Sequence, residues 1–148
     1  MDVVSAITQD HRVLDELFAR VEQEPEQRQQ LMEEIAARLS AHSVAEEIHV
    51  YPELERKSQD ESEQVSHGVD EHRDAEEKLV AAQAATDAEF TVAFKQFVEA
   101  IRHHVDEEET ELLPALTEAS TPARLNQLGD DFEQRRLAEL EDWNHPDT

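Results

Sequence analysis

The 148-residue sequence predicts an all-α fold, an up-down four-helix bundle with a short C-terminal fifth helix. Apolar residues recur at alternating steps of three and four along most of the chain, which places them on one face of each helix. No segment alternates apolar and polar residues as a half-buried strand does. Only two Gly and five Pro, with 38% hydrophobic residues, argue against the disorder that a high net charge suggests. We expect one domain, 1–143, and a flexible tail, 144–148.

The first two helices are each predicted from one stripe. The first stripe comprises Val4, Ile7, His11, Leu14, Phe18 and Val21. Pro25 marks the end of this helix. The second helix begins near Arg28, and Pro52 is expected to end or kink it, because proline lacks the amide donor that an interior turn requires. The second stripe comprises Leu31, Ile35, Leu39, His42, Glu46 and His49.

Three further helices follow a polar loop at 58–62. The third helix has a weaker, alanine-rich stripe of Val65, Val69, His72, Leu79 and Ala82. The fourth begins after a break and cap at Thr86-Asp87 and is bent or closed by Pro114. Its stripe comprises Phe90, Phe94, Phe97, Ile101, His104, Glu108 and Leu112. Thr121-Pro122 predicts a cap with proline at the first helical position. The fifth helix then carries Leu125, Leu128, Phe132 and Leu140.

Composition excludes several classes of function. The chain carries 37 acidic against 13 basic residues, a formal net charge of −24. Nucleic-acid binding is therefore not expected, because phosphate contacts need cations, and anionic membranes are disfavoured for the same reason. The absence of cysteine excludes disulfides, thiolate metal ligands and cysteine nucleophiles. With no signal peptide and no apolar stretch near the roughly 20 residues that span a bilayer, we expect a soluble cytoplasmic protein.

Six polar residues occupy positions that their helices otherwise give to apolar side chains. They are His11, His42, Glu46, His72, His104 and Glu108. Burying a carboxylate without a partner costs several kcal/mol, on the order of the stability of a small domain. Any one such His is more often a satisfied core residue than a ligand. Six of them in matched spacing instead predict a metal site.

The spacing forms an internal repeat. His42 to Leu54 reads HSVAEEIHVYPEL and His104 to Leu116 reads HVDEEETELLPAL, sharing His, Glu at +4 and +5, Pro at +10 and Leu at +12. Residues four apart lie on one helix face, one turn apart. Asp10-His11-Arg12 and Glu71-His72-Arg73 are also alike. The repeat predicts two helical hairpins whose antiparallel pairing brings four His and two Glu to one level.

The donor types indicate which metal the site holds. Six nitrogen and oxygen donors without sulfur favour two first-row ions with bridging carboxylates over one tetrahedral zinc. We predict two iron ions, a non-haem di-iron centre bridged by the two Glu and an oxo or hydroxo group, with manganese or mixed metals as the alternative. A ferritin-like site needs two Glu-x-x-His motifs. Glu46 to His49 supplies one, but Glu111 stands where the second His is required, so that hypothesis fails.

These residues resemble the hemerythrin-like, or HHE cation-binding, family over roughly residues 5–140. The resemblance rests on His11, His42-x-x-x-Glu46, His72 and His104-x-x-x-Glu108, in order and with fitting separations. It implies a four-helix bundle holding a non-haem di-iron centre that meets O2, H2O2 or NO. Members of the family carry oxygen, sense oxygen or iron, or act in oxidative or nitrosative stress defence.

Two departures from the oxygen-carrying members bear on function. Those members have a fifth His four residues before the third-helix ligand, where this chain has Gly68. They also have Asp five residues after the last His, where this chain has Glu109, with Glu108 at +4. The missing imidazole would leave an extra position for water, peroxide or a substitute ligand.

Other residues are weighed as additional ligands. His67 could substitute if the third helix starts near Gly68, although on a regular helix it points about 140° from His72. His49 lies one turn past Glu46 on the same face. Tyr51 could supply a phenolate if its helix unwinds. His103 and His145 are expected to be solvated.

Three functional hypotheses follow. The first is a di-iron redox protein that binds O2 or NO or decomposes H2O2. The missing fifth His favours H2O2 or NO, and the sequence does not identify a redox partner. Nearby carboxylates would accept hydrogen bonds from the ligand imidazoles, and Glu47 and Glu109 are candidates for this role or else plain surface residues. The second is a non-enzymatic iron sensor or store. The third is a structural bundle without metal.

Overall fold

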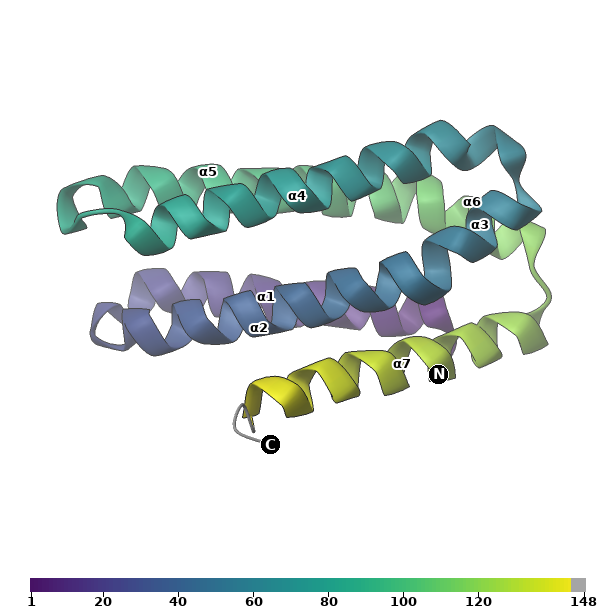
Figure 1. Ribbon diagram of the computed structural model, residues 1–148, viewed down its shortest axis with the longest axis horizontal. Coiled ribbons are helices and arrows are strands. Elements are labelled where there is room, and N and C mark those ends of the chain that lie inside the picture. Colours follow the sequence, from purple (N-terminus) through teal and green to yellow (C-terminus); the bar gives the residue numbers. More distant parts are fainter. Residues whose placement is uncertain (145–148) are drawn as a thin grey trace.

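Two antiparallel helical hairpins form the body of the molecule. In the computed structural model, which describes residues 1–144, the first hairpin is α1 (Val3–Gln23) with α2 (Arg28–Ala45). The second is α4 (Ser62–Ala84) with α5 (Asp87–Glu107). Figure 1 shows the four helices running along the long axis of the molecule, one hairpin beside the other. No strand occurs between residues 1 and 144, and the predicted all-α four-helix bundle is confirmed.

Short helical segments extend α2 and α5 or connect the long helices. They are η1 (Pro25–Gln27), η2 (Glu46–Val50), α3 (Tyr51–Lys57), η3 (Gln59–Glu61), η4 (Glu108–Leu112) and α6 (Leu113–Ala119). The two segments η2 and η4 are π-helical and each begins at a repeat Glu. Pro52 and Pro114 are the second residues of α3 and α6. The helices therefore continue past both prolines, with a π turn just before each of these segments. Pro52 therefore does not end its helix.

Two of the long helices are capped at their start by side chains. Asp2 Oδ1 accepts the backbone N–H of Ser5 at 2.9 Å at the start of α1. Thr121 Oγ1 accepts the backbone N–H of Arg124 at 3.2 Å, which confirms the predicted Thr121-Pro122 cap. Thr86 precedes α5 in extended backbone conformation, but its side chain makes no capping bond.

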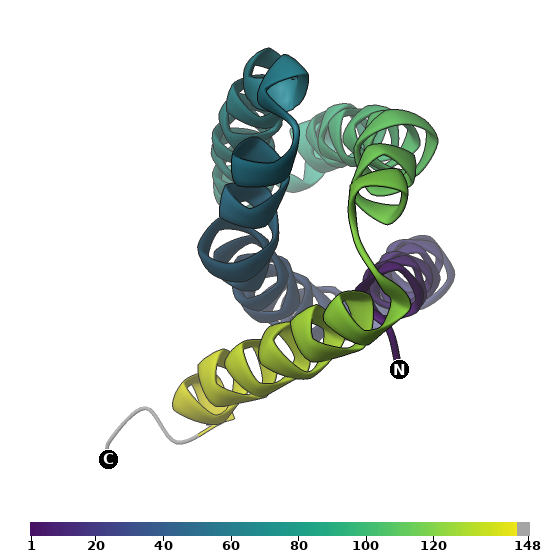
Figure 2. The ribbon, with the colours of Figure 1, turned by 90° about the vertical axis from the view of Figure 1, so that its right-hand side faces the viewer.

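The fifth helix, α7 (Pro122–Asn144), packs against α1 and α2. Figure 2 shows it running across the outside of the first hairpin, beside the N-terminus. Gly129 permits this approach, because a Cβ at that position would clash with the backbone of Met1 and Asp2. The predicted tail begins with the last residue of α7, and the rest of it lies outside the described residues.

The buried apolar side chains form two clusters, one on each side of the level at which the six polar residues lie. One cluster fills the bundle toward the α1–α2 and α4–α5 turns and includes Phe18, Phe94 and Phe97. The other lies beneath α3, α6 and α7 and includes Leu54, Leu116 and Phe132. The polar level is thus enclosed at both ends by packed apolar side chains.

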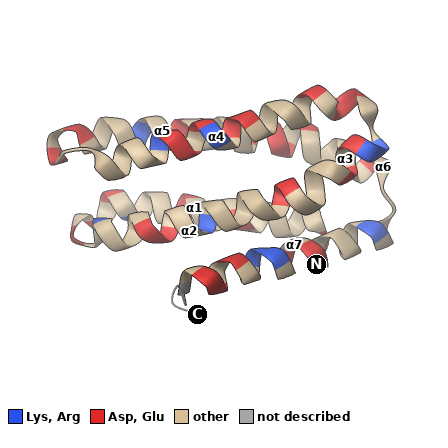
Figure 3. Cartoon of the chain, in the orientation of Figure 1, with Lys and Arg blue, Asp and Glu red and all other residues tan. Residues whose placement is uncertain are grey.

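Acidic side chains are spread over all the long helices (Figure 3). Most of the Asp and Glu residues between 1 and 144 are exposed, so their charges are solvated. Within residues 1–144, no helix combines the length and the hydropathy that crossing a membrane requires.

Candidate metal centre

The structure brings all six residues singled out by the sequence to one place. His11 comes from α1, His42 from α2, His72 from α4 and His104 from α5. Glu46 and Glu108 are the first residues of η2 and η4. The six side chains belong to residues that are at most 7% exposed, and both glutamates are completely buried.

Each glutamate lies between the two hairpins. Glu46 Oε1 is 3.1 Å from His42 Nε2 in its own hairpin and 3.2 Å from His72 Nε2 in the other. Glu108 Oε1 is 3.1 Å from His11 Nε2, and its Oε2 is 3.4 Å from His104 Nε2. The pairing of hairpins that the internal repeat predicts is therefore the pairing that forms the cluster.

The six residues form two groups of possible metal ligands. One group contains His11 and His42, the other contains His72 and His104, and both contain Glu46 and Glu108. Within each group the ligand atoms lie within 4.8 Å of one another. Each group could hold a metal ion, and the two groups share both carboxylates.

Several buried atoms of this cluster make no hydrogen bond within the described chain. They are Nε2 of His11, Nε2 of His42, both carboxylate oxygens of Glu46 and Oε1 of Glu108. Leaving a buried polar group unpaired costs about 1–3 kcal/mol, and more if it is charged. A metal cation would satisfy all of these atoms at once. The donor set of this cluster therefore fits a metal cation.

A carboxylate accepts a hydrogen bond from the outward-facing nitrogen of every one of the four imidazoles. The Nδ1 atoms of His11 and His72 lie 2.7 Å from Glu109 Oε2 and Glu47 Oε2, as predicted. Two further acceptors were not predicted: His42 Nδ1 is 2.6 Å from Asp10 Oδ2, and His104 Nδ1 is 2.9 Å from Glu71 Oε1.

These contacts fix the orientation of each ring. A neutral imidazole that donates from Nδ1 presents the lone pair of Nε2, which is the atom a metal binds. All four Nε2 atoms face the centre of the cluster in this arrangement. The matched dipeptides Asp10-His11 and Glu71-His72 were the sequence signal for the two acceptors that were missed.

The carboxylates make the site strongly attractive to positive charge. Burial alone would lower the pKa of His104, but its contacts with Glu108 and Glu71 raise that pKa to about 10. Burial would raise the pKa of Glu108, yet Glu46, His104 and His11 hold it well below the usual range. Protons and metal cations therefore compete for the same negative field.

Tyr51 adds a hydroxyl group to one half of the cluster. Its Oη donates to Glu108 Oε2 at 2.6 Å and lies 3.4 Å from Nε2 of both His72 and His104. Burial, with the charges of Glu46 and Glu108, raises the pKa of Tyr51 far above its ordinary value. The helix does not unwind here; instead, the π turn of η2 changes the register and directs Tyr51 inward.

Gly68 provides the space that Tyr51 occupies. A Cβ at Gly68 would lie 3.3 Å from Tyr51 Oη and 3.6 Å from His104 Cε1. The tyrosine hydroxyl therefore sits next to Gly68, the position at which the family resemblance implies a fifth His in oxygen carriers. In the repeat, Leu113 corresponds to Tyr51, so only the half with His72 and His104 has this hydroxyl.

The remaining histidines stand apart from this cluster. The side chains of His67 and His103 are 53% and 65% exposed, and both face Glu71 and Glu107 on the surface. His49 belongs to none of the possible metal-binding groups found among the described residues. His145 lies outside the described residues.

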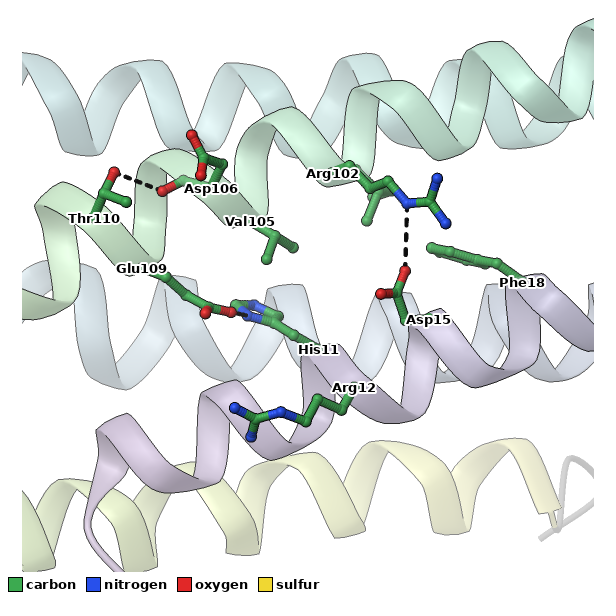
Figure 4. A pocket seen from close by; sticks show the side chains of 10 residues that line it. His11, Arg12, Asp15, Phe18, Arg102, Val105, Asp106, Glu109 and Thr110 are labelled. Carbon is green, nitrogen blue, oxygen red and sulfur yellow. Dashed lines mark hydrogen bonds and ion pairs between the residues drawn. The ribbon is translucent and has the colours of Figure 1, made fainter.

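Two hollows adjoin the centre. A cleft of about 370 Å³ runs between α1 and α5, and Figure 4 shows His11 and Glu109 along it, with Asp15 paired to Arg102 further along. A cavity of about 10 Å³ lies inside the bundle against His11, His42, His72 and His104. Its other walls are mostly apolar, and it has room for about one water-sized molecule.

Comparison with known proteins agrees with this geometry. The profile of the hemerythrin HHE cation binding domain matches residues 2–116, a range that holds all six residues of the cluster. An uncharacterized hemerythrin-like protein of Schizosaccharomyces pombe is 26% identical over 139 residues, which cover 90% of this chain and 68% of that protein. No solved structure gives a significant match. The chain therefore belongs to the hemerythrin family of HHE cation-binding domains.

Proposed function

We propose that this protein holds two iron ions and binds or reacts with O2, H2O2 or NO in the response to oxidative or nitrosative stress. One observation carries the proposal: two groups of buried donors share Glu46 and Glu108, so that each carboxylate can bridge two ions. The residues proposed to bind iron are His11, His42, Glu46, His72, His104 and Glu108. A pair of iron ions supplies reversible one-electron redox chemistry at two adjacent positions.

The choice of iron rests on donor type and charge. Imidazole and carboxylate donors without sulfur suit iron, and the two bridging carboxylates offset much of the charge of two divalent ions. The acceptors Asp10, Glu47, Glu71 and Glu109 raise the basicity of the imidazoles, which favours the more highly charged oxidised ions.

The size of the inner cavity restricts the reacting molecule. Its volume of about 10 Å³ has room for about one water-sized molecule, which supports a small reactant such as O2, H2O2 or NO over an organic substrate. The cleft between α1 and α5 leads from the surface to His11 (Figure 4).

Tyr51 favours reaction with H2O2 or NO over dedicated oxygen carriage. Its hydroxyl takes the space beside Gly68 and holds a proton on Oη, donated to Glu108. A buried proton donor at 3.4 Å from two of the proposed ligand nitrogens can assist a reaction that consumes protons, as the reduction of H2O2 does. Tyr51 is also the candidate for a seventh ligand.

An iron sensor or store is the second candidate, favoured by the contacts of α7. This helix lies beyond the matched range 2–116. Its Arg136 is 3.9 Å from Asp10 Oδ1, and Asp10 Oδ2 is the acceptor of His42 Nδ1. The ring of Phe132 in α7 packs edge-on against the ring of His42, with 5.4 Å between the ring centroids. Occupancy of the centre would thus affect the packing of α7.

The test is anaerobic loading with Fe(II), followed by metal counting and absorption spectra under O2, H2O2 and NO. Iron binding with turnover of H2O2, or a stable NO adduct, supports the redox proposal. Stoichiometric binding with no reaction, but a large gain in stability, supports the sensor. His104→Ala should abolish the reactions, whereas His49→Ala should not. A protein that binds no iron, and whose stability is unchanged by His104→Ala, contradicts both proposals.

A further inference from the structure

A second cluster of metal-binding side chains lies on the surface of the second hairpin. His67 and Glu71 are four apart on α4, and His103 and Glu107 are four apart on α5. Their four ligand atoms lie within 4.8 Å of one another. From these residues we propose an outer site for a single divalent first-row transition-metal ion. The proposal does not depend on what the buried centre holds.

The spacing between the imidazole nitrogens and the carboxylate oxygens fits the coordination sphere of a metal ion. His67 Nε2 lies 3.3 Å from both Glu71 Oε2 and Glu107 Oε2. His103 Nε2 lies 3.4 Å from Glu71 Oε2 and 2.9 Å from Glu107 Oε1. Ligand atoms at about 2.0–2.2 Å from one ion are about 2.8–3.6 Å apart at neighbouring octahedral or tetrahedral positions. All four separations fall within this range.

Direct pairing of protonated histidines explains the cluster less well. A charge-assisted N–H···O bond is about 2.7–2.9 Å long. Three of the four separations are 3.3 or 3.4 Å, and each imidazole faces two carboxylates through a single atom, Nε2. One ion at the centre would instead accept a lone pair from each of the four side chains.

The donor set indicates the class of ion. Two imidazoles and two carboxylates contain no sulfur, and the two carboxylates balance one divalent charge. Imidazole donors favour Zn²⁺, Co²⁺, Fe²⁺ or Ni²⁺ over Mg²⁺ and Ca²⁺, which prefer oxygen alone. His67 and His103 are more than half exposed, so the site is open to solvent and two ligand positions remain for water in an octahedral ion.

The positions of these residues around the helices explain how α4 and α5 contribute to both sites. The inward His104-x-x-x-Glu108 pair, which runs from α5 into η4, is preceded one residue earlier by His103-x-x-x-Glu107, which points about 100° away. Glu71 belongs to both sites. Its Oε1 accepts from His104 Nδ1 at 2.9 Å, while its Oε2 faces His67 and His103.

Zn²⁺ titration of the full chain in millimolar Mg²⁺ tests the proposal. The double variant His67→Ala/His103→Ala should bind one Zn²⁺ fewer per chain than the wild type, and His103→Ala alone should lower the affinity of that site at least 10-fold. His49→Ala, a histidine outside all the clusters, is the matched control and should bind as the wild type does. Thermal unfolding without metal should be unchanged in every variant. Equal numbers and affinities of Zn²⁺ in the wild type and the double variant, or displacement of this ion by Mg²⁺, would overturn the proposal.

Discussion

At the scale of single residues, the centre depends on the two ring nitrogens of each histidine, which face in opposite directions. Each of the four imidazoles turns Nδ1 toward a carboxylate and Nε2 toward the middle of the bundle. The pattern is the same in both hairpins. Asp10 and Glu71 accept the hydrogen bond from the second His of their own hairpin. Glu47 and Glu109 accept the hydrogen bond from the first His of the other hairpin. Ring orientation is therefore set by side chains that do not themselves face the centre of the cluster.

Removing one acceptor should weaken metal binding without changing the fold. We expect Glu109→Gln to lower iron affinity about 10–100-fold, because a neutral amide holds His11 Nδ1–H less strongly than a carboxylate does. Glu111→Gln, an exposed residue of the same segment, should have little effect. Competition with a chelator measures both affinities. Equal affinities in the two variants would contradict a role for Glu109.

Tyr51→Phe tests the asymmetric half of the centre. The variant keeps the ring in its buried position but removes the only hydroxyl donor to Glu108 Oε2 that the described residues provide. We expect iron affinity to fall about 10-fold and the visible spectrum of the iron-loaded protein to change, with far-ultraviolet circular dichroism unchanged. An unaltered spectrum and affinity would mean that the hydroxyl takes no part in the site.

At the scale of elements, the π turns and the fifth helix shape the site. The segments η2 and η4 start at Glu46 and Glu108 and place one extra residue in the turn before each proline. This register brings Tyr51 inward. The fifth helix closes the other side of the first hairpin, with Phe132 completely buried against His42.

Because Phe132 packs α7 against the first hairpin, truncating this side chain should cause a large loss of stability. Phe132→Ala should lower the free energy of unfolding by about 3–5 kcal/mol, because it removes a fully buried aromatic ring and leaves a cavity. Leu137→Ala, on the same helix but 55% exposed, should cost less than about 0.5 kcal/mol. Urea denaturation of the metal-free chains compares them. Similar losses in both variants would show that α7 is not docked as described.

An ion pair at the start of α7 predicts that the free energy of unfolding depends on pH. Arg124 Nε and Nη2 donate to Glu53 Oε1 and Oε2 at 2.9 Å each, and Arg56 and Lys57 also contact this buried carboxylate. The contact with Arg124 lowers the pKa of Glu53 to about 2, below the value of about 4.5 in an unfolded chain. Its stabilisation is therefore complete above pH 4.5 and is lost as the pH falls toward 2.

Glu53→Gln should remove that part of the acid sensitivity. Between pH 6 and pH 3 the wild type should lose on the order of 1–2 kcal/mol more of its free energy of unfolding than the variant does, after allowance for solvent screening. Glu118→Gln, which removes the same charge from an exposed position on α6, should follow the wild type. Parallel curves for Glu53→Gln and the wild type would contradict the assignment.

At the scale of the whole molecule, much of the fold and the site was predictable from periodicity. Helical steps placed His42 and Glu46 on one face, and the repeat placed the same pair in the other hairpin. Side chains that meet across helices were harder to predict. Asp10 serves His42 from a different helix, and Arg124 reaches Glu53 from 71 residues away. Tyr51 points inward only because a π turn shifts the α-helical register.

The net charge has a different meaning once the fold is known. Six of the carboxylates surround four imidazoles at one level of the bundle: Glu46, Glu108, Asp10, Glu47, Glu71 and Glu109. The same chain that repels anions across its outer face thus concentrates negative potential where cations are proposed to bind. Removing the metal should therefore destabilise the native state, because two glutamates then remain buried side by side.

The central claim is that one buried centre holds two metal ions that share Glu46 and Glu108. Iron counting on the His67→Ala/His103→Ala variant, loaded anaerobically and freed of excess iron by gel filtration, tests it without interference from the outer site. The account predicts two irons per chain in this variant, and loss of both when Glu46→Ala is added, because this carboxylate belongs to both groups. A count of one or none in the double variant, or loss of a single iron with Glu46→Ala, would contradict it.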